Sequence, residues 1–343
     1  MKKKRISIVD IANSLQISKT TISFILNGKA KEKRISDDMV AKVNQFIHET
    51  GYKPSALARS LRTGRSKIIG FLIEDISHPF FSSIARLIED EATKNGYKII
   101  YASTDNDVLK TREIITMMRN RQVDGYIITP PLGIEAEITE LIGEGIPVVV
   151  FDRYLPGVKT DYVIVDNFHG TYNATTHLVD QGYRDVVFVT FRSLQMQMRD
   201  RESGYSEAMK ERKLKPVVLE LEYNHSRLPI MEALTDLLPL QTDMDAVLFA
   251  TNRIGVCGLK VIEHLGKNMK DVAIASFDDD IVYNFHKPSV TAVAQPIEDI
   301  ANNVISLMIN KLKKRHQSAD FQTVILDTAL KIRDSTRAKK QHN

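Results

Sequence analysis

The chain has 343 residues and a formal net charge of +4, and this length favours a small domain attached to a larger one. Its single cysteine, Cys257, excludes an internal disulfide and a cysteine-based zinc site, and is expected to be a buried apolar residue. No apolar run is long enough to cross a bilayer and no apolar signal segment follows the basic N-terminus, so the expected location is the cytoplasm.

Two short helices are predicted at the start of the chain. Ser7 is placed to cap the first helix, whose apolar residues recur on one face between residues 8 and 15. Ser18 is placed to cap the second, which ends at Asn27 and Gly28, a pair that tolerates left-handed backbone. The polar side chains of the second helix then face outward near its N-terminal end: Lys19, Thr20, Thr21 and Ser23. A helix-turn-helix protein presents such groups to base edges and phosphates in a major groove.

Charge favours DNA binding over a helical bundle of another function, which the amphipathic pattern alone would also fit. Residues 1–65 hold 14 Lys and Arg against five Asp and Glu, a balance of +9, so the rest of the chain carries −5. A basic excess confined to one end indicates a polyanion held by the N-terminal module.

A third helix and a conditional fourth are predicted next. Ser36 is placed to cap the third helix, which closes the small core and stops at Gly51. Pro54 then breaks the chain, and Ser55 can start a helix of about two turns, which is too short to be stable alone in water. This segment is predicted to be disordered when free and helical when docked on DNA and on its twin from a second subunit. A flexible linker is the alternative.

From Ile68 onward, short apolar strands alternate with amphipathic helices, the last of them predicted over residues 297–314. This alternation predicts parallel sheets that are covered on both faces. The rhythm is similar before and after about Asp161, which favours two stacked α/β subdomains with a ligand cleft between them. The predicted strands cover residues 68–73, 98–102, 125–129, 147–151, 163–165, 185–190, 217–221, 246–250 and 272–277.

From about Ile8 to about Ile332, the chain resembles the LacI/GalR family of bacterial transcriptional regulators. The residues that carry the resemblance include Val9-Asp10-Ile11-Ala12, residues 17–28, the hinge-like residues 52–62, His78-Pro79-Phe80-Phe81, Phe151-Asp152-Arg153, Arg201-Glu202-Ser203-Gly204-Tyr205, Phe277-Asp278 and Gln295-Pro296. The family implies an all-α helix-turn-helix head (1–53), a hinge helix or linker (54–65) and a charged C-terminal tail (331–343). Between them it implies a two-lobed α/β body like a type I periplasmic binding protein, with parallel sheets, for effector binding and dimerisation (66–330).

The resemblance implies a homodimer whose heads read the two halves of a pseudo-palindromic operator. The implied DNA-binding residues are Lys19, Thr20, Thr21, Ser23, Phe24, Asn27, Ser55, Leu61 and Arg62. Leu61 matches the hinge leucine that wedges between central base pairs in the minor groove. Phe24 stands where a hydrogen-bonding residue is common, and its ring either contacts a thymine methyl or packs inward. The loop of residues 29–34 is a few residues longer than usual, which allows added phosphate contact.

The resemblance also implies an effector cleft. The implied effector-binding residues are His78, Phe80, Phe81, Arg153, Gln195, Arg201, Tyr223, Asn252 and Asp278. Aromatic rings would meet the C–H face of a sugar, while Arg201 would donate to its hydroxyls and Asp278 would accept from them. A purely structural role is an equal alternative to ligand binding for three of these residues: Arg153, Gln195 and Tyr223. His78 stands where the family commonly has Asn, and Arg253 stands where it usually has Asp. Together with Arg192 and Arg199, these departures add positive charge near the cleft, so a sugar phosphate or a uronate is allowed as well as a neutral sugar.

The expected function is therefore a sequence-specific DNA-binding regulator, a repressor by first choice, controlled by a small effector. A sugar-binding protein or a sugar-processing enzyme is the alternative. No phosphate-cradling glycine loop, metal-ligand cluster or nucleophile elbow is found in the sequence, so no catalytic residue, metal or cofactor is expected. The sequence leaves open whether the effector releases the operator or strengthens binding. The segment after Lys331 lacks leucine heptads, which favours a dimer over a tetramer.

Overall fold

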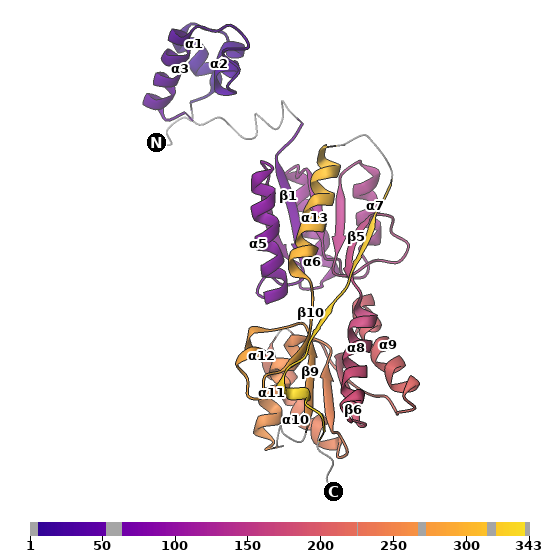
Figure 1. The fold of residues 1–343 in the computed structure, drawn as a ribbon. Helices are drawn as coiled ribbons and strands as arrows, with labels where there is room; N and C mark the ends of the chain where they lie inside the picture. Colours follow the sequence, from indigo (N-terminus) through magenta and orange to yellow (C-terminus); the bar gives the residue numbers. More distant parts are fainter. Residues whose placement is uncertain (1–5, 53–63, 225, 267–271, 314–319, 340–343) are drawn as a thin grey trace. The chain divides into compact units, whose positions relative to one another are not determined.

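The computed structural model describes residues 6–52, 64–224, 226–266, 272–313 and 320–339. It divides into two compact units, residues 1–67 and 68–343, which we call the head and the body and describe separately (Figure 1). The hinge residues predicted to bind DNA, Ser55, Leu61 and Arg62, lie outside the described residues.

The head contains the three predicted helices, α1 (Ile8–Leu15), α2 (Lys19–Leu26) and α3 (Asp37–Thr50). The predicted caps are confirmed: the side chains of Ser7, Ser18 and Ser36 each accept a hydrogen bond from a backbone N–H of the following helix. These bonds satisfy N–H groups that a helix start leaves unpaired. The three helices enclose a small core of five buried side chains: Ile11, Ala12, Ile22, Ile25 and Val43.

The N-terminal lobe of the body is a six-stranded parallel sheet in the order β11-β5-β4-β3-β1-β2. Its strands are β1 (Ile68–Ile73), β2 (Lys98–Ser103), β3 (Gly125–Ile128), β4 (Val148–Phe151), β5 (Asp161–Val165) and β11 (Thr323–Leu326). One face packs against α5 (Pro79–Lys94) and α13 (Ile297–Lys313), and the other against α6 (Val108–Asn120) and α7 (Glu135–Gly143). Side chains buried on both faces explain why these strands are continuously apolar.

The C-terminal lobe has a second six-stranded sheet in the order β12-β10-β9-β8-β6-β7, in which β12 is antiparallel to β10. Its strands are β6 (Val186–Phe191), β7 (Val217–Leu221), β8 (Ala246–Phe249), β9 (Ala273–Phe277), β10 (Thr291–Ala294) and β12 (Ala329–Lys331). Its helices are α8 (Asn167–Asp180), α9 (Met196–Glu211), α10 (Arg227–Leu237), α11 (Asn252–His264) and α12 (Ile281–Phe285). Gly204 lets α8 and α9 pack closely, because a Cβ there would lie 2.2 Å from the carbonyl oxygen of Phe168.

The chain passes between the lobes three times, between β5 and α8, between β10 and α13, and between β11 and β12 (Figure 1). The first passage is at Asp166 and not at about Asp161, because β5 still belongs to the first sheet, where it pairs with β4. Three strands, β10, β11 and β12, were not predicted. The two-lobed α/β body with mainly parallel sheets is otherwise confirmed.

Residues 331–336, predicted to belong to a charged tail, are part of the C-terminal lobe. Lys331 ends β12, and residues 334–336 form a 3₁₀ turn. Ser335 and Thr336 are buried: the Ser335 hydroxyl donates to the Ile274 carbonyl at 2.6 Å, and the Thr336 hydroxyl lies 2.7 Å from that of Thr291. Polar side chains that pair with buried backbone and hydroxyl groups explain how this apparently hydrophilic segment packs inside the lobe. Among the described residues, no helix has the length and apolar character of a membrane span.

Candidate functional site

The outward face of α2 carries the residues predicted to read DNA. Lys19 and Thr20 are exposed in its first turn. Thr21 and Asn27 already have partners within the head: the Thr21 hydroxyl lies 2.9 Å from that of Ser18, and the Asn27 amide donates to the Ser23 carbonyl at 2.5 Å. The first turn of α2 therefore combines free polar side chains with helix-start N–H groups, a combination suited to base edges and phosphates.

Phe24 is half-buried and is not part of the apolar core of the head. Its ring is covered by Lys33, whose Nζ lies 5.5 Å from the ring centroid. Lys33 belongs to the long loop of residues 29–34, which is an ordered turn: the Ile35 N–H donates to the Ala30 carbonyl at 2.9 Å, and Arg34 has a left-handed φ of 52°. The loop thus adds a cationic group directly beside the face that carries Phe24.

A cavity of about 240 Å³ lies between the two lobes of the body. Several of its residues directly follow a strand, among them Glu74 after β1, Asp152 after β4 and Asp278 after β9. This is the carboxyl-end position expected for ligands of parallel sheets. Eight of the nine predicted effector residues line the cavity: His78, Phe80, Phe81, Arg153, Gln195, Arg201, Tyr223 and Asp278.

The ninth, Asn252, lies beside the cavity and does not line it. Its side chain is buried, with Oδ1 3.0 Å from Nε2 of His78 and the amide donating to Asp280 at 3.1 Å. Asn252 therefore holds His78, which does line the cavity, and joins the two lobes.

On the N-terminal lobe, the cavity wall is built around the buried guanidinium of Arg153. It donates to Glu74 at 2.8 Å, to Asn106 at 2.8 Å and to Asp152 at 3.0 Å. Burial by itself would raise the pKa of Glu74, but the charge of Arg153 and the hydrogen bonds from Tyr223 and Arg153 outweigh it and lower that pKa to about 2. Burial dominates for Asp152, whose pKa is raised although Arg153 opposes the shift.

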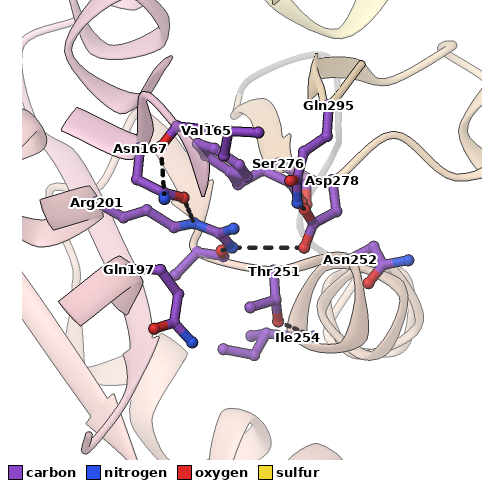
Figure 2. A network of polar contacts seen from close by, with 12 residues as sticks. Val165, Asn167, Gln197, Arg201, Thr251, Asn252, Ile254, Ser276, Asp278 and Gln295 are labelled. Carbon is purple, nitrogen blue, oxygen red and sulfur yellow. Dashed lines mark hydrogen bonds and ion pairs between the residues drawn. The ribbon is translucent and has the colours of Figure 1, made fainter. Parts of the chain in front are cut away.

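On the C-terminal lobe, Arg201 is the centre of a second network (Figure 2). Its guanidinium donates to Asn167 and to the Ala250 carbonyl, both at 2.8 Å, lies 3.5 Å from the carboxylate of Asp278, and stacks 3.7 Å from the ring centroid of Phe277. Gln295 donates to the other oxygen of Asp278 at 2.6 Å. Because Asn167 and Gln295 stand at two of the passages between the lobes, this network links the cavity to the segments about which the lobes would turn.

Polar contacts among the described residues bridge the cleft, and three of them involve the residues that follow β1. The Tyr223 hydroxyl donates to Glu74 at 2.6 Å, Arg253 pairs with Asp75 at 3.1 Å, and His78 meets Asn252. Each contact joins a residue after β1 to a residue of the C-terminal lobe. The relative position of the two lobes is therefore fixed in part by residues that lie at the cavity.

Several cavity residues were absent from the prediction: Glu74, Asn106, Asp152, Gln197 and Gln295. Glu74 and Asp152 immediately follow predicted strands, and Gln197 precedes Arg201 by one helical turn, so strand ends and helix periodicity were the signals that could have found them. In the part of the chain that the structure describes, no group of three or more His, Cys, Asp or Glu is placed to hold a metal ion.

Two family models match parts of the chain. Residues 7–55 match the model of the bacterial regulatory proteins of the lacI family, and residues 175–336 match a periplasmic binding protein-like domain. The ribose operon repressor of Halalkalibacterium halodurans is 30% identical over 332 residues, 96% of this chain and 97% of that protein. The transcriptional regulator RegA of Clostridium saccharobutylicum is 31% identical over 336 residues, 96% of this chain and 99% of that protein.

Solved structures share the fold. The lac repressor dimer bound to operator and the anti-inducer ONPF aligns with a TM-score of 0.83 at 18% identity, over 98% of this chain and all of that one. A LacI family regulator from Enterococcus faecium with bound ribose aligns with a TM-score of 0.70 at 24% identity, over 80% of this chain and all of that one. A helix-turn-helix head joined to a two-lobed binding body defines a ligand-responsive transcriptional regulator. The chain belongs to the lacI family of bacterial regulatory proteins.

Proposed function

We propose that this protein is a repressor of transcription that acts in the cytoplasm and binds a pseudo-palindromic operator as a homodimer. Its operator affinity is set by a small sugar-like molecule in the cavity between the lobes, and it performs no catalysis. One observation carries this proposal: a basic helix-turn-helix head stands on the same chain as an interlobe cavity that combines phenyl rings with buried donors and acceptors. A sugar requires such a combination, because its hydroxyls need polar partners while its C–H face needs apolar surface.

On DNA, Lys19, Thr20 and Phe24 are proposed to face base edges, with Thr21, Ser23 and Asn27 supporting the helix or meeting phosphates. From the sequence alone, Ser55, Leu61 and Arg62 are proposed to form the hinge that enters the minor groove at the centre of the operator. In the body, Phe80 and Phe81 would meet the apolar face of the ligand.

Control follows from differential binding. A ligand that touches both lobes stabilises one relative orientation of them, and only a difference in affinity between orientations shifts the equilibrium. The contacts Glu74–Tyr223, Asp75–Arg253 and His78–Asn252 must rearrange whenever the lobes move. The coupling free energy therefore depends on these bridges as well as on contacts to the ligand.

The direct test is selection of DNA sites from a random library by the purified full-length chain, followed by anisotropy titrations of the selected site with and without sugars. We expect a palindromic site whose affinity changes in the presence of at least one sugar. A selection that enriches no palindrome, or conversion of the responding sugar into another compound by the pure protein, would contradict the proposal.

The Asp278→Asn variant is expected to lose ligand response while retaining operator binding. Removing a charged acceptor weakens a buried hydrogen bond by about 1.5–3 kcal/mol, which raises the ligand Kd by roughly 10- to 150-fold. Calorimetric titration with the responding sugar measures this change. Asp236→Asn on the exposed face of α10 is the matched control. An unchanged Kd in Asp278→Asn would remove Asp278 from the ligand site.

The Phe24→Ala variant is expected to lose selectivity for one base pair of the operator. One mismatched base pair typically weakens operator binding by about 1–3 kcal/mol, and the variant should lose this cost at the base pair that Phe24 contacts. Removal of a half-buried ring outside the core has a small effect on folding. Titration of operators substituted at each position measures the first effect, and thermal melting the second. Phe46→Ala, which trims a ring packed on the core, should show the reverse pattern.

A further inference from the structure

The cationic side chains around the cavity are already paired with carboxylates. Arg153 pairs with Glu74 and Asp152, and Arg201 with Asp278. At the rim, Arg253 pairs with Asp75 at 3.1 Å, and Arg192 pairs with Glu220 at 3.2 Å and Glu222 at 2.5 Å. Six carboxylates thus face the four guanidinium groups that line the cavity.

This balance disfavours an anionic ligand. A phosphate or carboxylate brought into the cavity would have to take a guanidinium away from its present partner and leave that buried carboxylate without a counter-charge. Arg153 and Arg201 are the most buried of the four, with side chains only 5% and 4% exposed, so this cost is greatest where the cavity is deepest. A neutral ligand leaves all these pairs intact.

A second, independent observation indicates the polarity of the ligand. Gln197, on the first turn of α9, lines the cavity and is only 6% exposed. Its amide donates to Gln195 at 2.9 Å, but its Oε1 is buried and has no hydrogen-bond partner among the described residues (Gln197 is labelled in Figure 2). A buried acceptor without a donor is costly, and a ligand hydroxyl would satisfy it. A phosphate oxygen, itself an acceptor, would not.

We propose that the cavity takes a neutral, hydroxyl-rich molecule of the size of one sugar ring, that one of its hydroxyls donates to Gln197 Oε1, and that phosphorylated and carboxylated sugars are excluded. This proposal rests on the proposed function. The size follows from the volume of about 240 Å³, the space of about eight water molecules in the liquid. Of the effector classes that the sequence allows, the charge pairing favours the neutral sugar, and the unsatisfied acceptor requires a hydroxyl on it.

The test compares neutral sugars with anionic sugars of the same skeleton, using the full-length chain and calorimetry at constant ionic strength. The probes are ribose and ribose 5-phosphate, glucose and glucose 6-phosphate, and galactose and galacturonate. Within the pair that binds, we expect the neutral member to bind about 100-fold more tightly than the anion. An anion that binds as tightly as its neutral partner, or more tightly, would overturn this inference and leave the proposed function standing.

A variant tests the role of Gln197. Gln197→Leu is expected to weaken binding of the neutral sugar by about tenfold or more without lowering the melting temperature, whereas Gln241→Leu, in the same lobe but outside the cavity, should change neither. Unchanged affinity in Gln197→Leu would overturn the assigned contact. If no sugar of either kind binds or alters operator affinity, both this inference and the proposed effector fail together.

Discussion

Replacing Arg153 by methionine is expected to lower the free energy of unfolding of the body by about 3–5 kcal/mol. The guanidinium is buried and holds the carboxylates of Glu74 and Asp152, so its loss leaves two buried acids without a counter-charge. Urea unfolding followed by circular dichroism measures the change. Arg86→Met is the matched control, because Arg86 is 70% exposed and its ion pairs on α5 should contribute less than about 1 kcal/mol. Equal losses in the two variants would mean that the buried acids are neutral in the native protein.

The same network makes stability depend on pH. The pKa of Glu74 is about 2 in the folded chain against an ordinary value of 4.5, so ionised Glu74 stabilises the fold above pH 4.5. That contribution, about 3 kcal/mol, is lost as the pH falls from 4.5 towards 2. The difference in unfolding free energy between wild type and Glu74→Gln should therefore shrink between pH 6 and pH 3. A constant difference would contradict the lowered pKa. Asp152, whose pKa is raised, contributes in the opposite direction.

Operator affinity is expected to fall by about 10³- to 10⁵-fold between 50 mM and 200 mM salt if the dimer neutralises roughly six to ten phosphates. The head has the charge for this, since residues 1–65 hold 14 Lys and Arg against five Asp and Glu. Anisotropy of a labelled operator in a potassium chloride series gives the slope of log affinity against log salt. A flat response would contradict DNA binding by the head.

The loop of residues 29–34 is expected to contribute to the slope of log affinity against log salt. If Lys33 reaches a phosphate in each subunit, Lys33→Gln should reduce the slope by about one unit per subunit and weaken all DNA sequences alike. Lys98→Gln, on an exposed position of the body, is the control. A reduced affinity for only one operator sequence would instead place Lys33 at a base.

The parts of the fold that depend on local interactions could be predicted from the sequence. A serine cap and its helix lie within a few residues of each other, so the three head helices followed from their own segments. The strands β11 and β12 could not be predicted in this way, because their residues are partly exposed and the strands they pair with are distant in the sequence. β11 pairs with β5, and Thr323 lies opposite Tyr162. Edge strands with little buried surface have a weak apolar pattern.

Which residues surround the cavity could largely be predicted from the sequence, but the ion pairs of its arginines could not. Eight predicted effector residues meet at one cavity, since the resemblance carries the positions of residues that follow the strands. The partners of the arginines could not be predicted, because Asp75 and Arg253 are 178 residues apart in the chain and Glu74 and Arg153 are 79 apart. In the sequence, Arg253 therefore indicated an added cationic group near the cleft, whereas in the structure it forms an ion pair with Asp75 across the cleft.

The three passages between the lobes have a consequence for synthesis of the protein on the ribosome. Strands β1 to β5 emerge first, but α13, one of the two helices that cover one face of their sheet, and the edge strand β11 are made only after nearly the whole C-terminal lobe. Until then the apolar face that Ile300, Val304 and Met308 will cover is open to water and to other nascent chains. A premature stop codon just before Ile297 would remove both α13 and β11 and would consequently disrupt the first-made lobe as well as the last.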